Sequence, residues 1–134
     1  MASPVPHIEA AKLTLPEVIT GHTAGHAVPI NISATMLPVH FPGTGEIIAS
    51  LQEDDADQVK KAVAAARDRF QSGEWSQCAV DEKQRVLRGA AQAIRNHAHD
   101  LALQESVCAG LPFAHLAARQ IPRAADNFDF FADY

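Results

Sequence analysis

The spacing of hydrophobic positions changes near residue 54 and divides the chain into two parts. In the first part, β-branched runs alternate with prolines and glycines, which is typical of short strands and turns. In the second part, hydrophobic residues recur every three or four positions, which is the period of an amphipathic helix. We therefore expect a flexible arm at residues 1–14, strands and turns at residues 15–53, and helices at residues 54–134.

Two runs in the first part predict a β-hairpin. Residues 17–20 and 27–33 have β-branched character, and the turn-rich sequence GHTAGH separates them. Pro29 lies inside the second run and favours an edge strand or a bulge, because proline has no amide hydrogen for the strand ladder. After a Pro-Gly-Thr-Gly turn, a further short strand is expected at residues 46–51.

The first helix has clear signals at both of its ends. Asp55, followed three residues later by Gln58, is a capping-box pattern, which predicts that the helix begins here. Gly73 is a typical helix stop. The apolar stripe of this helix consists of Ala56, Val59, Ala62, Val63, Ala66 and Phe70.

Three more helices are expected, at residues 81–97, 100–109 and 113–134. The residues of the first of these that should face inward are Val86, Leu87, Ala90, Ala91 and Ile94. The cations of the same helix that should face water are Lys83, Arg85, Arg88 and Arg95. In the last helix, Pro122 should cause a kink or a split just before Ile121, because its ring clashes with the preceding turn.

The last helix also carries aromatic residues on more than one of its sides. They are Phe128, Phe130, Phe131 and Tyr134. Burying an aromatic side chain of this size contributes roughly 2–3 kcal/mol, so leaving several of them in water is unfavourable. The pattern indicates that these helices pack against a further layer of protein.

Composition narrows the class of protein. The 134 residues are 47% hydrophobic and 20% charged, which is typical of a globular chain. A net charge of −5 gives no basic surface for nucleic acid or for anionic membranes. No stretch of sequence is apolar enough for a membrane span, and the N-terminus lacks the pattern of a signal peptide. We therefore expect a cytoplasmic protein.

Four segments, in the same order, resemble the aldehyde dehydrogenase superfamily. They are PGTGEIIA at residues 42–49, the helix at residues 55–70, Trp75 before the second helix, and ESVCAGLP at residues 105–112. Each motif alone is weak, but their joint order is specific. The chain therefore resembles the N-terminal segment of an aldehyde dehydrogenase.

This resemblance implies a fold that is mainly α with a short N-terminal β-hairpin and strand region. It corresponds to the N-terminal part of the α/β, Rossmann-like dehydrogenase fold, without the nucleotide-binding βαβ core. The family's catalytic cysteine and general-base glutamate would lie beyond Tyr134, so no catalytic, cofactor-binding or metal-binding residue is assigned within the chain. The complete enzyme would use NAD or NADP, which this segment alone would not bind. Its partner would be the remainder of a dehydrogenase or another subunit, in a homo- or hetero-oligomer.

The closing run, RQIPRAADNFDFFA at residues 119–132, is similar to the branch of hydroxymuconic-semialdehyde dehydrogenases, including the carboxymethyl-substituted ones. In that branch, the arginine after the proline lies in the substrate tunnel and binds the distal carboxylate. The resemblance therefore makes Arg123 the candidate substrate-binding residue, with Arg119 one turn earlier as a second candidate. A guanidinium group suits this role because it offers two parallel donors and stays charged. The alternative is that Arg123 is an ordinary solvated helix residue.

The chain also departs from the family pattern. Cys108 replaces the usual aspartate or asparagine, so the family's structural monovalent cation is not expected. Ala79 stands where a capping residue usually begins the second helix, a loss of about 1 kcal/mol. Neither Cys78 nor Cys108 has the Gly-x-x-Cys setting of the family's nucleophile. His22 and His26 have a helical metal-site spacing, but the neighbouring glycines favour a turn.

Two functional hypotheses remain from the sequence. In the first, the chain is the N-terminal fragment or subunit of an NAD(P)-dependent dehydrogenase for carboxylated semialdehydes, and it supplies scaffold, substrate-tunnel wall and oligomer contacts. In the second, it is a non-catalytic helical module derived from such an enzyme, and its open aromatic face docks on a partner protein. Neither hypothesis makes the segment catalytic alone.

Overall fold

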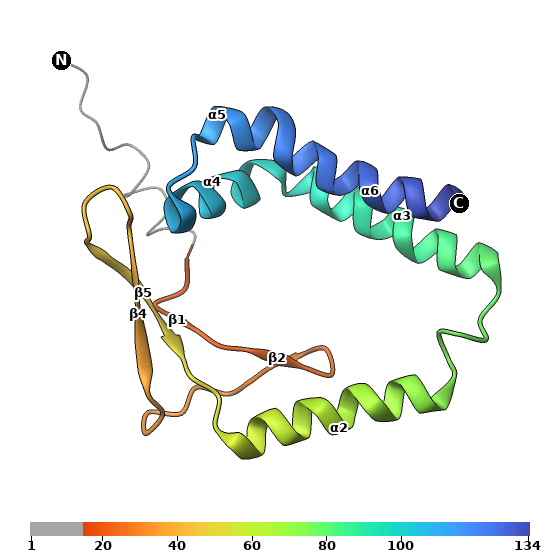
Figure 1. The fold of residues 1–134 in the computed structure, drawn as a ribbon, viewed down its shortest axis with the longest axis horizontal. Helices are drawn as coiled ribbons and strands as arrows, with labels where there is room; N and C mark the ends of the chain where they lie inside the picture. Colours follow the sequence, from red (N-terminus) through yellow and green to blue (C-terminus); the bar gives the residue numbers. More distant parts are fainter. Residues whose placement is uncertain (1–14) are drawn as a thin grey trace.

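A computed structural model describes residues 15–134 (Figure 1). The expected flexible arm at residues 1–14 lies outside the described residues. Among the described residues, every strand lies before residue 53 and every helix after it. The segment is mainly helical with a short N-terminal strand region, as the sequence predicts.

The larger sheet has β5 (Ile47–Gln52) in its centre. β4 (Met36–His40) pairs with one edge of β5 in antiparallel fashion, and β1 (Val18–Ile19) pairs with the other edge in parallel. The turn between β4 and β5 closes through a 2.8 Å hydrogen bond from the Gly45 amide to the Phe41 carbonyl. The strand expected at residues 46–51 is therefore confirmed, shifted by one residue.

The predicted β-hairpin is wrong in its strands. The run at residues 17–20 provides β1, which pairs with β5 instead of with residues 27–33. The real hairpin lies in the expected turn, residues 21–26, and the first residue of the second run, with β2 (His22–Thr23) pairing with β3 (His26–Ala27). A two-residue turn is sufficient here because Ala24 and Gly25 both have positive φ, at 53° and 83°.

The stretch after β3 is not a strand, and the side chain of Gln52 holds it against the sheet. The buried Gln52 accepts a 2.6 Å hydrogen bond from the Asn31 amide and donates a 3.2 Å bond to the Pro29 carbonyl. The backbone in this stretch therefore finds its partners on a side chain of β5 rather than in a strand ladder.

α2 (Ala56–Ser72) confirms the first predicted helix and both of its ends. The Asp55 side chain accepts bonds from the amides of Asp57 and Gln58, and the Gln58 side chain accepts from the Asp55 amide, which completes the capping box. Gly73 follows the last turn with φ of 72°, a left-handed conformation that favours glycine. α2 nevertheless contributes no buried residue.

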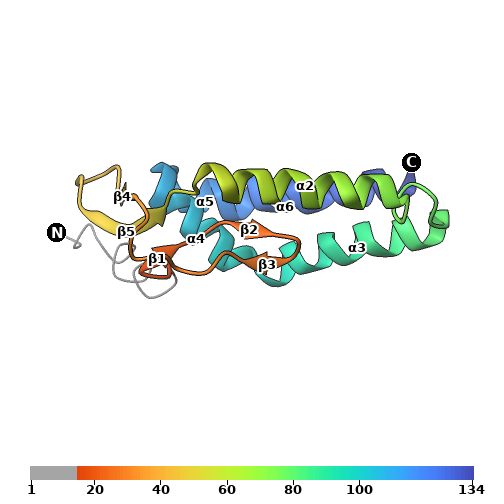
Figure 2. The ribbon, with the colours of Figure 1, turned by 90° about the horizontal axis from the view of Figure 1, so that it is seen from below.

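α3 (Val80–Asn96) and α6 (Ile121–Asp133) lie side by side along one long side of the molecule, and α2 runs along the opposite side (Figures 1 and 2). The buried residues of α3 and α6 are all alanines, namely Ala91, Ala125 and Ala132. Small side chains let two helix backbones approach closely. The predicted inward face of α3 is confirmed at Ala91, but it is wrong at Val86, which is 41% exposed.

α4 (Ala98–Ala109) packs on the sheet and forms the hydrophobic core with it. Ile48 from β5 contacts Leu103 and Val107 from α4, and Phe41 and Phe113 pack around them. After α4, Gly110 has φ of 72°, and a Cβ atom there would lie 3.2 Å from the Cβ of Pro42. The turn at residues 42–45 and the end of α4 are therefore in contact, which brings two of the family-like motifs together.

Candidate functional site

The last helical stretch carries both candidate substrate-binding arginines. α5 (Phe113–His115) continues into the π-helical segment η1 (Leu116–Gln120) and then into α6 without a break. The Ile121 amide donates to the Leu116 carbonyl, five residues earlier, which is the π pattern. The predicted disturbance just before Ile121 is therefore present as a π turn, but the helix is not split.

The π turn has a physical cause in Pro122. A proline inside a regular α-helix removes one hydrogen bond, and its ring clashes with the carbonyl four residues earlier. Widening the turn before it relieves that clash, and Pro122 then occupies the first turn of α6, where an amide hydrogen is not needed. The widened turn sets the directions in which the side chains of Arg119, within the turn, and Arg123, after it, leave the helix.

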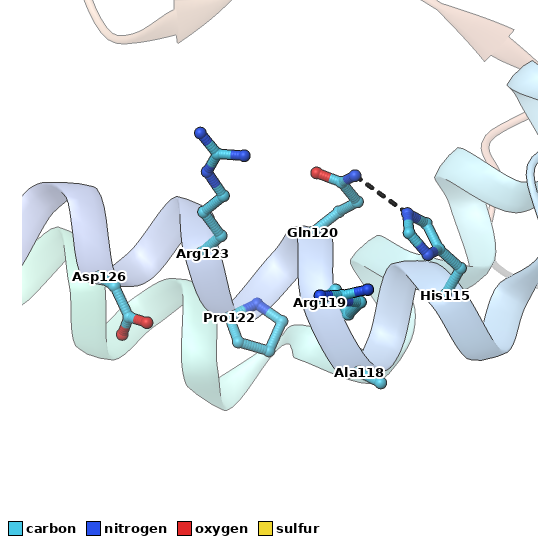
Figure 3. Close-up of a pocket in the computed structure, with 7 residues that line it drawn as sticks. All are labelled: His115, Ala118, Arg119, Gln120, Pro122, Arg123 and Asp126. Atoms are coloured by element: carbon cyan, nitrogen blue, oxygen red, sulfur yellow. Dashed lines mark hydrogen bonds between the residues drawn. The ribbon is translucent and has the colours of Figure 1, made fainter.

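Arg119 and Arg123 line one shallow hollow of about 390 Å³ on this helix. His115, Gln120 and Asp126 are its other polar members (Figure 3). Gln120 donates its side-chain amide to the His115 ring nitrogen Nε2 at 3.0 Å. Arg123 and Gln120 project from the same side of the helix, whereas Asp126 points to the opposite side (Figure 3).

Both arginines are exposed and unpaired within the described part of the chain. Neither forms an ion pair with any carboxylate of residues 15–134. An unpaired guanidinium in a hollow can accept an anionic group as a bidentate partner. The chemistry of this surface therefore suits a carboxylate.

Asp126 is held by α3 rather than by its own helix. Arg95 of α3 donates through Nη2 to Asp126 at 2.9 Å and to Asp129 at 2.7 Å. The hydrogen bonds that Arg95 donates, to Asp129 first and to Asp126 second, raise the pKa of its guanidinium group above the ordinary value. This three-residue bridge joins α3 to α6 directly beside the hollow.

The two cysteines do not have the surroundings of a nucleophile. Partial burial raises the pKa of the Cys108 thiol, and the negative charge of Glu105 acts in the same direction. A raised pKa disfavours the thiolate, which is the reactive form. Cys78 donates its thiol to the Trp75 carbonyl at 3.2 Å.

The other candidate sites from the sequence are structural features. His22 and His26 lie on adjacent hairpin strands, where Thr23 rather than His22 faces His26. Among residues 15–134, no group of three potential metal ligands is close enough to hold a metal ion.

None of the helices described is both long enough and apolar enough to cross a membrane.

The described residues contain no strand–helix–strand unit. Binding of NAD in this class of fold uses the glycine-rich turn of a βαβ unit. No strand follows a helix within residues 15–134, so these residues contain no such unit.

Sequence reasoning missed the part of the site that depends on tertiary contacts. The sequence predicted only that Arg95 faces water. In the structure, Arg95 binds Asp126, which lies 31 residues later in the sequence. The Gln120–His115 pair is local, but it spans five residues, which is the contact distance of a π turn rather than of an α-helix. The first contact depends on the docking of α3 against α6, and the second depends on the π turn.

Comparisons with known proteins agree on one family. The family described as "Aldehyde dehydrogenase family" matches residues 31–134. The mitochondrial aldehyde dehydrogenase family 2 member B4 of Arabidopsis thaliana is 33% identical over 129 residues, which cover 93% of this chain and 24% of that protein. The 5-carboxymethyl-2-hydroxymuconate semialdehyde dehydrogenase of Escherichia coli is 32% identical over 92 residues, or 69% of this chain and 19% of that protein.

The solved structures give the same result for the fold. The NAD-dependent aldehyde dehydrogenase from Sinorhizobium meliloti superposes with a TM-score of 0.82 at 30% identity, over 98% of this chain and 25% of that one. The chain thus spans about a quarter or less of the length of these relatives. It belongs to the aldehyde dehydrogenase family.

Proposed function

We propose that this chain is the N-terminal part of an NAD(P)-dependent dehydrogenase that oxidises carboxylated semialdehydes to acids. The segment contributes scaffold, oligomer contacts and one wall of the substrate tunnel. Other residues of the complete enzyme supply the nucleophile, the general base and the cofactor site, and the cofactor accepts the hydride. Arg123, assisted by Arg119, binds the distal carboxylate of the substrate.

The observation that carries this proposal is the pair of exposed arginines in one hollow, with no carboxylate of the described residues bound to either. A cation that structural ion pairs do not use is available for a ligand. Similarity to the Escherichia coli 5-carboxymethyl-2-hydroxymuconate semialdehyde dehydrogenase supports the substrate class, since that substrate carries a carboxylate away from the aldehyde. The name of the Sinorhizobium meliloti structure supports NAD as the cofactor.

The test uses a complete dehydrogenase in which residues 15–134 replace the corresponding segment of the Escherichia coli relative. Arg123→Ala should raise KM for 5-carboxymethyl-2-hydroxymuconate semialdehyde by about 10- to 100-fold, because a hydrogen bond to a charged group contributes about 1.5–3 kcal/mol. The KM for an uncharged aldehyde should not change. Arg123→Lys should lose part of the effect, because an ammonium group cannot make the two parallel bonds.

Arg67→Ala is the matched control, because Arg67 is also an exposed helix arginine but lies on α2. It should leave both KM values unchanged. If Arg123→Ala changes KM for the charged and the uncharged aldehyde equally, the assignment of Arg123 is wrong. If the complete chimaera assembles but oxidises no carboxylated semialdehyde, the proposed substrate class is wrong.

A further inference from the structure

The lining of the hollow includes a carboxylate that would compete with a substrate anion for Arg123. Asp126 lies three residues after Arg123 and lines the same hollow. On a helix, opposite charges at this spacing are neighbours and commonly pair. An Arg123–Asp126 pair would occupy the guanidinium group and place a negative charge where a substrate carboxylate has to bind.

The structure keeps these two charges apart. The Asp126 carboxylate bonds to Arg95 of α3 at 2.9 Å, and Figure 3 shows it directed away from Arg123. The same Nη2 atom of Arg95 binds Asp129 at 2.7 Å. The side chain of Arg95 is 40% exposed, compared with 70% for Asp126, so the arginine is the more enclosed member of that pair.

From this arrangement we propose that Arg95 is a positioning residue, which holds the Asp126 carboxylate away from Arg123 and so keeps Arg123 free for an anionic substrate. The inference rests on the proposed function, since it concerns the same hollow. Arg95 does not touch the substrate. It acts through Asp126, and its loss would leave that carboxylate to compete for Arg123.

The simpler role for Arg95 is to clamp α6 onto α3, and the chain contains a matched control for it. Arg88, also on α3, bonds to Asp133 at the end of α6 at 2.5 Å. This bridge joins the same two helices with the same chemistry. Its aspartate lies ten residues from Arg123 in sequence and does not line the hollow. Arg88→Gln therefore measures the effect of a lost clamp alone.

The test uses the complete chimaeric dehydrogenase described above. Arg95→Gln should raise KM for the carboxylated semialdehyde by about two- to fivefold, the range expected for one exposed ion pair, with kcat unchanged. The KM for an uncharged aldehyde should stay at its original value. Adding Asp126→Asn to Arg95→Gln should restore the original KM, because the competing charge is then gone. Arg88→Gln should change neither KM.

Three results would overturn the inference. Equal effects of Arg95→Gln and Arg88→Gln would show that only the helix clamp matters. Equal effects on charged and uncharged aldehydes, or failure of Asp126→Asn to rescue, would show that Asp126 does not compete. If the Arg95→Gln enzyme fails to assemble, the single variant Asp126→Asn decides between the two roles. An unchanged KM for the carboxylated semialdehyde supports the inference. A KM lowered two- to fivefold shows that Asp126 already reaches Arg123 and contradicts it.

The outcomes also separate this inference from the proposed function. If Arg123→Ala has no selective effect on the carboxylated substrate, the proposed function fails and the inference fails with it. If Arg123→Ala is selective but Arg95→Gln is not, only the role of Arg95 is wrong.

Discussion

Two valines on different helices provide a direct measure of which apolar surfaces this segment covers by itself. Val107 of α4 is fully buried, in contact with Ile48 and Leu103 in the core. Val63 of α2 belongs to the predicted apolar stripe but is 62% exposed. The substitution Val→Ala removes the same atoms at both sites, so a difference between them reports burial alone.

The expected magnitudes follow from that exposure. Removing two buried methyl groups loses roughly 1.6 kcal/mol of transfer free energy, and the cavity left at Val107 adds about 1 kcal/mol. At Val63, about a third of the side chain is covered, so the loss is roughly 0.6 kcal/mol. Alanine gains about 0.6 kcal/mol of helix propensity at both sites. We therefore expect Val107→Ala to lower the free energy of unfolding by about 2 kcal/mol and Val63→Ala to leave it almost unchanged.

The assay is urea unfolding of the 134-residue chain, followed by the helical circular dichroism signal. The free energy differences come from the shift in midpoint at a common slope. If the two substitutions have equal effects, the exposure of α2 described here is wrong. The same pair in the complete dehydrogenase tests what lies beyond the segment. There, Val63→Ala should speed thermal inactivation as Val107→Ala does if additional protein covers α2. A Val63→Ala enzyme as heat-resistant as its parent would contradict that covering.

Two further predictions concern single side chains. Asp55→Ala removes the acceptor for the amides of Asp57 and Gln58, which lie 2.9 and 2.8 Å from it. The substitution should lower the free energy of urea unfolding by about 1 kcal/mol. Asp55→Asn keeps an acceptor, so it should lower the free energy of unfolding by less. Partial burial and the charge of Glu105 raise the pKa of the Cys108 thiol, so the folded chain favours the protonated thiol. The resulting contribution to stability is present below the pKa of the thiol in the unfolded chain. It is lost as the pH rises through the pKa of the thiol in the folded chain. At mildly alkaline pH, iodoacetamide should alkylate Cys108 more slowly than a cysteine in a short peptide, and Glu105→Gln should reduce the difference; identical pH profiles by mass spectrometry would contradict this.

The helices were predictable because their ends carry local signals. Asp55, Gln58 and Gly73 act within one helical turn of themselves, and the structure places α2 between them. Such caps need no information about what the helix packs against. This is why α2 is predicted correctly at both ends although it buries no residue.

The strands were harder because pairing depends on register between distant segments. β4 was not predicted, since Pro38 in its middle lacks an amide hydrogen. Within residues 15–134, β4 is an edge strand beside β5, where a proline is tolerated. The hairpin was placed too wide because Ala24 adopts positive φ, which is uncommon for any residue with a Cβ atom. Neither fact can be read from hydrophobic alternation alone.

The candidate site also has one part that the local sequence predicts and another that depends on tertiary contacts. Arg123 and Arg119 were identified from a local motif, and the hollow that they share is built by the helix on which that motif lies. The bridge from Arg95 to Asp126 and Asp129 joins residues 31 and 34 positions apart, and it exists only because α3 and α6 are docked. The sequence therefore predicted the two arginines proposed to bind a substrate, but not the bridge from α3 that lies beside them.

The distribution of side-chain sizes between α3 and α6 gives a reason to expect more protein around this segment. The fully buried residues of the two helices are alanines, and small side chains allow the helix backbones to lie close together. The aromatic residues of α6 remain outside the seam between the two helices, and Phe130 is 60% exposed and Phe131 is 65% exposed. Phe130 lies edge-on to Phe131 at a centroid distance of 5.3 Å, and it stacks on the Tyr134 ring at a centroid distance of 6.0 Å. A freestanding helix pair would gain stability by placing its largest apolar groups in the seam. The opposite arrangement fits a helix whose outer face is covered by another layer, and the Val63→Ala comparison applies the same reasoning to α2.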